Sequence, residues 1–251
     1  MKIIKSICIA FSMYSKIPVP QFEWKEEDMK YALCFFPFVG GVIAAVFFIF
    51  RRLADFYSFG TISITFLTAA IPVLITGGIH IDGYMDTMDA LHSYQEKEKK
   101  LEILKDPHIG AFSVIMLLLY YLCYLSVLSE IRTAEEVKMI AAGFVLSRVA
   151  GAAAVISLKP AKKNGLLRIF ADAASKRNVK TALLLEGGIC MVYMLYLSTF
   201  TAVVIFCTAA LWFLFYRARC YKEFGGVSGD TTGYFITILE FLIAAVTVIM
   251  I

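Results

Sequence analysis

Charged residues are scarce in this chain. Only 18% of its 251 residues are Asp, Glu, Lys or Arg, whereas 60% are hydrophobic, and the mean hydropathy is +0.76. Soluble domains carry about 25% charged and about 45–50% apolar residues, so the composition excludes an ordinary soluble domain. The net charge of +4 is too small to indicate a nucleic-acid partner.

Several motifs that define other classes of protein are missing. The six cysteines (8, 34, 123, 190, 207 and 220) include no CxxC pair, so they indicate neither a thiolate zinc site nor a disulfide framework. The GK[ST] signature of a P-loop is absent. Residues 1–15 lack a small-x-small cleavage site, so we interpret them as a retained interfacial or re-entrant segment rather than a signal peptide.

Long apolar runs dominate the chain instead. A membrane-spanning helix needs about 20 mostly apolar residues, and about seven segments satisfy this requirement. They cover roughly residues 31–50, 61–79, 110–129, 138–158, 181–197, 199–216 and 233–251. The sequence therefore predicts an all-α, polytopic membrane bundle that forms one domain over residues 1–251 and contacts membrane lipids.

The basic residues are distributed unevenly among the segments that connect these spans. The segments expected on one side carry 19 Lys and Arg residues, those on the other side carry four, and Arg148 lies inside the fourth span. Basic residues accumulate on the cytoplasmic side of a membrane. The sequence therefore predicts a multi-pass protein of the cytoplasmic (inner) membrane with its N-terminus inside and its C-terminus outside. The loops at about 80–109 and 217–232 would both face the cytoplasm.

Three aspartates, Asp82, Asp86 and Asp89, follow the second span in the run GGIHIDGYMDTMDALHS. In a helix their spacing places them on one face, where like charges repel. Mg²⁺ prefers such hard oxygen ligands, and its charge would offset the repulsion. A solvated acidic helix face is the alternative interpretation of this run taken alone.

Further candidates flank the aspartates. The three histidines of the chain stand at positions 80, 92 and 108, and this clustering favours a site in which His80 accepts a proton. Gly77 and Gly78 permit either close approach of the backbone to a ligand or close helix packing. Lys105 and Asp106 lie near the expected membrane surface, where a lysine can bind a phosphate or meet lipid headgroups.

The run FGGVSGDTTG precedes the last span. Glycine-rich segments at a helix N-terminus expose backbone N–H groups that favour anions, so Gly229 and Thr231 are candidate phosphate-binding residues. Asp230 is either a further metal ligand or a helix cap. Arg148 lies near the middle of its span, and a charge at this depth indicates a functional or paired residue.

Taken in order, these motifs resemble the cobalamin synthase family, the adenosylcobinamide-GDP ribazoletransferases. The resemblance is carried by KIPVP, FFPFVGGVIA, GGIHIDGYMDTMDALHS, LEILKDPHIGAF, LSR and GGVSGDTTG, and it covers nearly the whole chain. It implies a Mg²⁺-dependent membrane enzyme of adenosylcobalamin (vitamin B12) biosynthesis. Such an enzyme transfers cobinamide-phosphate from adenosylcobinamide-GDP to α-ribazole or its 5′-phosphate and releases GMP.

The implied chemistry gives the candidate residues their expected roles. The metal ligands would be Asp82, Asp86, Asp89 and Asp230. His80 or one of the carboxylates would accept the proton, and Lys105 and Arg148 would stabilise phosphate charge. After GDT the family commonly carries an Asn-Glu pair where this chain has Ile236 and Thr237, so the expected ligand role shifts to Asp230.

Two other functions fit a membrane chain with clustered carboxylates. A CDP-alcohol phosphatidyltransferase would carry a DGxxAR run, whose Ala-Arg pair this chain lacks after Asp82 and Gly83, and a prenyltransferase would favour a DDxxD run, which is absent. An ion-coupled transporter would place its acids near the bilayer midplane between repeated halves, whereas these acids gather near one surface. The sequence leaves open whether the chain forms homo-oligomers.

Overall fold

The structure, a computed structural model, describes residues 2–161 and 166–251. In this part of the chain the regular elements are helices, and an isolated parallel bridge joins Pro160 to Val227. The helices in chain order are α1 (Lys2–Tyr14), α2 (Glu26–Met29), η1 (Ala32–Cys34), α3 (Phe36–Phe56), α4 (Thr61–Thr76), α5 (Ile79–His92), α6 (Lys97–Ile103), α7 (Ala111–Ser129), α8 (Ala134–Ser157), α9 (Leu166–Ala173), α10 (Lys176–Leu197), α11 (Thr199–Glu223) and α12 (Gly229–Met250).

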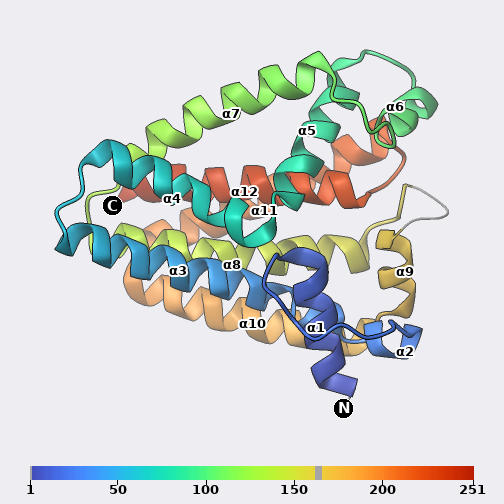
Figure 1. Ribbon diagram of the computed structural model, residues 1–251, viewed down its shortest axis with the longest axis horizontal. Helices are drawn as coiled ribbons and strands as arrows, with labels where there is room; N and C mark the ends of the chain where they lie inside the picture. Colours follow the sequence, from blue (N-terminus) through green and yellow to red (C-terminus); the bar gives the residue numbers. More distant parts are fainter. Residues whose placement is uncertain (1, 162–165) are drawn as a thin grey trace.

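The long helices form a bundle suited to a membrane. Among the described residues, six helices are long and apolar enough to cross it, namely α3, α7, α8, α10, α11 and α12. The pair α4 and α5 passes the same test together but is bent by 95°, and counting it as one broken span gives seven. The predicted polytopic all-α bundle is therefore confirmed. Figure 1 shows the long helices running along the longest axis of the molecule.

Helix α8 forms the centre of the bundle. In an 18-residue apolar stretch of α8, 83% of the residues are buried. The corresponding value is 22% for α7, α10 and α11, whose apolar side chains face outward. Outward-facing apolar side chains are what a lipid environment favours. α8 packs extensively against α3, α12 and α10.

The second predicted span is where the structure differs most from the sequence-based expectation. α4 ends at Thr76, and Gly77 and Gly78 adopt φ values of +66° and +83°, a region that other residues rarely enter. The chain then begins α5, so the aspartate run is helical, as its spacing predicted, and the polar connection expected from about residue 80 begins only after His92. Tyr84 and Leu91 on this helix are buried, which shows that α5 has an apolar face that packs into the bundle.

Other spans extend beyond the apolar windows that predicted them. α10 begins at Lys176 instead of residue 181, and α11 continues to Glu223 instead of residue 216. Lys, Arg and Glu are good helix formers, so polar segments continue these helices. α8 begins four residues early because Thr133 and Glu136 form a capping box at its start.

One end of the bundle collects most of the polar elements. Figure 1 shows α1, α2, α6 and α9 at this end and the C-terminus at the opposite end. Lys100 of α6 forms a salt bridge with Glu223 at the end of α11. The predicted grouping of the basic segments on one side agrees with this arrangement, although Lys162 and Lys163 lie outside the described residues.

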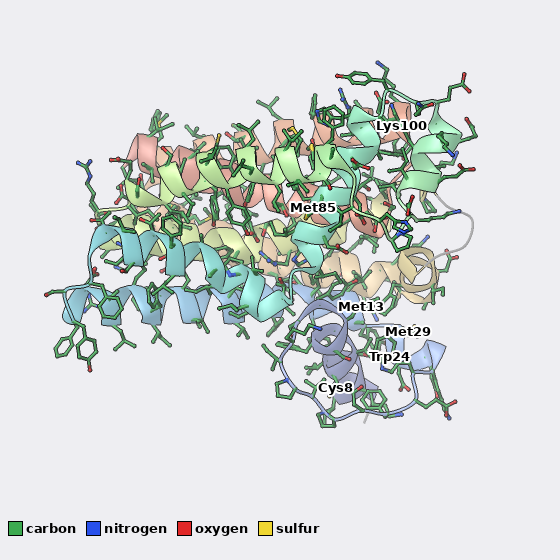
Figure 2. All side chains as sticks on the ribbon, turned by 45° about the horizontal axis from the view of Figure 1, so that its top comes forward. Cys8, Met13, Trp24, Met29, Met85 and Lys100 are labelled. Carbon is green, nitrogen blue, oxygen red and sulfur yellow. The ribbon has the colours of Figure 1, made fainter. Side chains whose placement is uncertain are left out.

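A small second core lies at this polar end. Its buried members are Ile9 of α1, Ala32 of η1 and Phe170 of α9, and four partly buried side chains pack against them: Met13, Phe22, Trp24 and Met29. Figure 2 labels three of these four side chains beside α1. The N-terminal segment thus packs against the end of the bundle rather than extending as another span.

Candidate functional site

Helices α5 and α12 cross with their backbones in contact. A methyl group added at Gly233 would lie 2.9 Å from the carbonyl oxygen of His80, closer than real Cβ atoms come. The Thr237 hydroxyl donates a hydrogen bond to the same carbonyl oxygen at 3.2 Å. Small residues at such crossings let membrane helices approach closely. The crossing brings the two polar motifs, far apart in the sequence, to one place.

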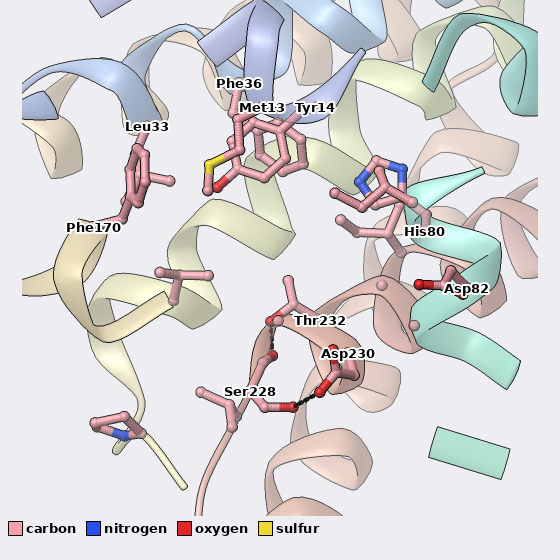
Figure 3. Close-up of a pocket in the computed structure, with 18 residues that line it drawn as sticks. Met13, Tyr14, Leu33, Phe36, His80, Asp82, Phe170, Ser228, Asp230 and Thr232 are labelled. Carbon is pink, nitrogen blue, oxygen red and sulfur yellow. Dashed lines mark hydrogen bonds between the residues drawn. The ribbon is translucent and has the colours of Figure 1, made fainter. Parts of the chain in front are cut away.

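A cavity of about 280 Å³ lies beside this crossing, and we call it the aspartate cavity. Both motifs contribute to its wall, as Figure 3 shows. The lining residues from the two motifs are Ile79, His80, Asp82, Gly83, Val227, Ser228, Gly229, Asp230, Thr232 and Gly233. The predicted convergence of the aspartate run with the GDTTG run is therefore observed.

Two of the four predicted metal ligands, Asp82 and Asp230, line the aspartate cavity from different helices. Asp82 is in the first turn of α5 and is exposed, and Asp230 is in the first turn of α12. Negative charge in the first turn is favoured by the partial positive charge of a helix N-terminus. Figure 3 shows the two side chains on their separate helices, α5 and α12, beside the cavity.

The cap of α12 is Ser228 rather than Asp230. The Ser228 hydroxyl accepts a hydrogen bond from the Thr231 amide at 3.2 Å, and the Thr231 hydroxyl accepts one from the Ser228 amide at 2.8 Å. Thr231 is therefore a buried capping residue and does not line the cavity, unlike the neighbouring Gly229 and Thr232. Ser228 also donates to the carboxylate of Asp230 at 3.3 Å.

The other two predicted ligands lie farther along α5. Asp86 and Asp89 are both partly buried, and neither lines the aspartate cavity. The Asp89 carboxylate lies against Gly110 at the start of α7, where an added methyl group would lie 2.0 Å from one of its oxygens. The predicted helical spacing of the three acids is thus observed, but only Asp82 reaches the cavity.

Mg²⁺ fits the oxygen groups of the cavity. Within residues 2–161 and 166–251, no three His, Cys, Asp or Glu side chains are grouped closely enough to hold a metal by themselves. Mg²⁺ usually keeps several water ligands and is bound through one or two carboxylates together with substrate phosphates. Asp82 and Asp230, one from each helix, are the two carboxylates among the described residues that line the cavity.

His80 is on the wall of the aspartate cavity, as predicted for a proton acceptor. It is 8% exposed, and its ring lies 5.8 Å from that of Phe36. Its Nδ1 atom is buried and has no hydrogen-bond partner in the protein. A buried ring nitrogen without a partner is costly, so this atom needs a hydrogen-bond partner, such as a water, that the protein does not supply.

Arg148 lies behind His80 rather than on the cavity wall. It is 1% exposed and forms an ion pair with Glu240 of α12, and it donates to the Ser147 hydroxyl at 3.0 Å. Arg148, Glu240 and His80 border a separate cavity of about 20 Å³. Arg148 lies within α8, a helix long and apolar enough to cross a membrane, and the structure pairs it with an acid from another helix.

The predicted phosphate-binding loop after α6 lies outside the aspartate cavity. Lys105 and Asp106 are exposed, and Asp106 accepts hydrogen bonds from the backbone N–H and the ring of His108. These bonds lower the pKa of the Asp106 carboxyl. Gly77 and Gly78 form the bend between α4 and α5 and line a neighbouring cavity.

The sequence did not reveal the opposite wall of the aspartate cavity, which is apolar. Five side chains from α1, η1, α3 and α9 form much of it: Met13, Tyr14, Leu33, Phe36 and Phe170. The aromatic and apolar residues of the N-terminal segment were the available signal, but nothing in their pattern showed which helices they would meet. The cavity therefore has an acidic side and an apolar side.

Comparisons with known proteins support one family. Residues 6–248 match the family described as cobalamin-5-phosphate synthase. A curated adenosylcobinamide-GDP ribazoletransferase from Lachnoclostridium phytofermentans is 46% identical over 249 residues, covering 99% of this chain and 95% of that protein. Proteins of the same name from a Geobacillus species and from Clostridium botulinum strain Alaska E43 are 34% and 29% identical, covering 89% and 95% of this chain and 87% and 94% of their own lengths.

No solved structure matches the chain. The family match extends from α1 to α12 and includes both motifs that meet at the aspartate cavity. The chain belongs to the cobalamin-5-phosphate synthase family.

Proposed function

We propose that this chain is an adenosylcobinamide-GDP ribazoletransferase that assembles the nucleotide loop of adenosylcobalamin. It transfers cobinamide-phosphate from adenosylcobinamide-GDP to α-ribazole or α-ribazole 5′-phosphate and releases GMP. Curated relatives that carry this name cover most of the chain. The structural observation that carries the proposal is the meeting of Asp82 and Asp230, from opposite ends of the chain, at one cavity.

The two sides of the aspartate cavity suit a substrate of mixed character. A corrinoid offers a broad apolar surface, which the side chains of Tyr14, Phe36 and Phe170 can contact. The diphosphate carries negative charge and has to be held near groups that neutralise it. The substrate would therefore place its diphosphate toward α5 and α12 and part of its corrin toward α1 and α9.

The reaction is a displacement at phosphorus. The acceptor hydroxyl oxygen forms a bond to the phosphorus next to cobinamide, the bond from that phosphorus to the bridging oxygen breaks, and GMP leaves with this oxygen. The hydroxyl proton passes to a base. His80 and Asp82 are the candidates, because both line the cavity.

Asp82 and Asp230 would hold Mg²⁺, with Asp86 and Asp89 as weaker candidates because they do not line the cavity. When bound, the ion supplies charge that offsets the developing negative charge on the diphosphate. The Ser228 hydroxyl holds the Asp230 carboxylate in place, and the capping box fixes the start of α12.

The aspartate cavity would open toward the cytoplasm. It lies at the end of the bundle that carries α1, α6 and α9, where most of the described basic residues are found. The N-terminus would be inside the cell and the C-terminus outside. A reporter fused after Ile251 tests this orientation, and a cytoplasmic signal from it would reverse the assignment.

The activity is tested with purified protein in detergent. The assay contains adenosylcobinamide-GDP, α-ribazole and Mg²⁺, and chromatography measures GMP and the corrinoid product. We expect equal amounts of both products and no reaction without the acceptor. Absence of cobalamin and of GMP from folded protein would disprove the proposed function.

A further inference from the structure

A second cavity, of about 580 Å³, borders Asp82 on its other side, and we call it the lysine cavity. It shares three lining residues with the aspartate cavity, namely Met13, Ile79 and Asp82. The rest of its wall comes from the end of α1, the segment after it, the end of α4, the bend between α4 and α5, and α5 itself: Ser12, Ser15, Lys16, Thr76, Gly77, Gly78, Ile81 and Met85. Figure 2 labels Met13 of α1 and Met85 of α5, which both line this cavity.

Lys16 gives this cavity its charge. Among the described residues that line either cavity, it is the one Lys or Arg. Lys105 and Arg148, which the sequence suggested as phosphate-binding cations, line neither cavity, and Arg148 is already paired with Glu240. A reaction on a diphosphate needs positive charge near the reacting groups. Lys16 is therefore the protein cation placed to supply it.

The backbone of Lys16 is anchored, and its exposed side chain lies over Gly77. Its backbone N–H donates to the carbonyl oxygen of Ile75 at 2.8 Å, which ties the segment after α1 to the end of α4. The side chain then crosses the face of Gly77, where a methyl group would lie 2.4 Å from Cε and 2.5 Å from Cγ of Lys16. The glycine thus leaves the space that the lysine stem occupies.

We propose that Lys16 binds a substrate phosphate next to Asp82, which makes the lysine cavity the second half of the active site. This inference depends on the proposed function for the identity of the substrate. The phosphate belongs to one of two groups, the 5′-phosphate of the acceptor or the diphosphate of adenosylcobinamide-GDP. Gly77 has no side chain, so it leaves room for the side chain of Lys16. This is a second reason for a glycine at this position, besides the bend that its positive φ permits.

The test is the variant Lys16→Met, which keeps much of the apolar stem and removes the charge. Steady-state constants are measured with adenosylcobinamide-GDP and either α-ribazole or α-ribazole 5′-phosphate. Loss of a charged hydrogen bond to a phosphate raises KM on the order of 10- to 100-fold. A rise confined to the phosphorylated acceptor assigns Lys16 to the acceptor phosphate. A rise in KM for adenosylcobinamide-GDP with both acceptors assigns it to the diphosphate.

The matched control is Lys25→Met, because Lys25 is an exposed lysine of the same N-terminal segment that lines neither cavity. Constants for Lys16→Met equal to those for Lys25→Met would overturn the inference. They would mean that Lys16 is a surface lysine of the kind that meets lipid headgroups. Lys16→Arg retains the charge and is expected to recover part of the lost affinity.

A second pair of variants tests whether the contact between Gly77 and Lys16 positions the lysine. Gly77→Ala and Gly78→Ala both force alanine into a left-handed backbone conformation, but only the first methyl group meets Lys16, since nothing lies within 4 Å of the second. We expect the two variants to lose similar thermal stability and Gly77→Ala to show the greater rise in KM. Equal KM values in the two variants would contradict the idea that Gly77 positions the side chain of Lys16.

Failure of the inference can be told apart from failure of the proposed function. If the wild-type protein turns over neither acceptor, the proposed function fails, and binding of inorganic diphosphate measured by calorimetry then decides the role of Lys16. Weaker binding by Lys16→Met than by Lys25→Met would support phosphate binding at this lysine. Equal binding by the two variants would overturn it.

Discussion

Gly83 and Asp230 lie in direct backbone contact: a methyl group on Gly83 would be 2.6 Å from the carbonyl oxygen of Asp230 and 2.9 Å from its Cα. The contact lies one residue from Asp82 on α5 and at Asp230 itself on α12. The separation of the two carboxylates is therefore set by how closely these two helix backbones approach, and that approach requires a glycine.

Gly83→Ala should separate α5 from α12. The methyl group meets backbone atoms, which cannot rotate away, so we expect a loss of about 1–3 kcal/mol in stability. Turnover by the folded variant should also fall, because Asp82 and Asp230 move apart. This loss should exceed what the lower stability alone explains. Thermal unfolding in detergent and the GMP assay measure the two effects.

The matched control for Gly83→Ala is Gly188→Ala in α10, where an added methyl group has nothing within 4 Å. This variant should turn over like the wild type and should be as stable or slightly more stable, because alanine favours a helix over glycine. Wild-type turnover in Gly83→Ala would contradict the idea that this crossing sets the geometry of the site.

Asp82→Asn and Asp230→Asn should each reduce kcat by at least about 100-fold. Removing one electrostatic contact at a reacting group typically reduces kcat by about this factor. The amide keeps the shape of the carboxylate and removes its charge, so the fold should persist. Raising the Mg²⁺ concentration should restore part of the activity if the carboxylates bind the ion. The GMP assay over a Mg²⁺ titration measures both effects.

Two comparisons sharpen this prediction. Asp55→Asn changes an exposed aspartate in the last turn of α3, which ends at the opposite side of the bundle, and it should have no effect. Asp89→Asn should have a smaller effect than Asp82→Asn, because Asp89 faces Gly110 instead of the cavity. Near-normal kcat in both Asp82→Asn and Asp230→Asn would contradict the proposed metal site.

Much of the architecture was predictable because single helices carry the information. A spanning helix satisfies its own backbone hydrogen bonds, so an apolar run of sufficient length predicts it without knowledge of its neighbours. The alternation of basic segments then predicted that the loops near Asp82 and Asp230 share one side. The shared cavity follows this expectation.

The details that failed depend on contacts between helices. The spacing of the run around Asp86 predicted a helix, but it did not show that the other face of this helix, for example at Tyr84, is buried in the bundle. Thr231 belongs to a motif that suggests phosphate binding, but its hydroxyl is used by the cap at Ser228. The sequence also did not indicate the role that we propose for Lys16, because its side chain lies against Gly77, a residue distant in the sequence.

Arg148 and Glu240 should behave as one unit. Removing either partner leaves a buried charge without its counter-charge, which costs about 3–5 kcal/mol. We therefore expect Arg148→Met and Glu240→Gln each to lower stability strongly, and the double variant to lose clearly less than the sum of the two. Thermal unfolding of the three variants gives the coupling energy.

Turnover of the Arg148 and Glu240 variants separates two roles. Arg148 does not line the aspartate cavity, so the double variant should keep a large part of its kcat at a temperature where it is folded. Additive losses of stability would contradict the pairing. Complete loss of kcat in the folded double variant would instead support the sequence-based prediction that Arg148 stabilises phosphate charge.

The two capping boxes offer a last test of how α12 serves the site. Ser228 caps α12 beside the aspartate cavity, and Thr133 caps α8 without lining it. Replacing either by alanine removes the same kind of hydrogen bond to the third helical N–H and should cost about 1 kcal/mol of stability.

Only Ser228→Ala also removes the hydrogen bond to Asp230. Because groups that hold a metal ligand typically contribute 10- to 100-fold to activity or affinity, we expect a loss of about that size in Ser228→Ala alone. Ser228→Thr keeps the hydroxyl and should retain most of the activity, whereas equal activity in Ser228→Ala and Thr133→Ala would show that Ser228 serves only the helix.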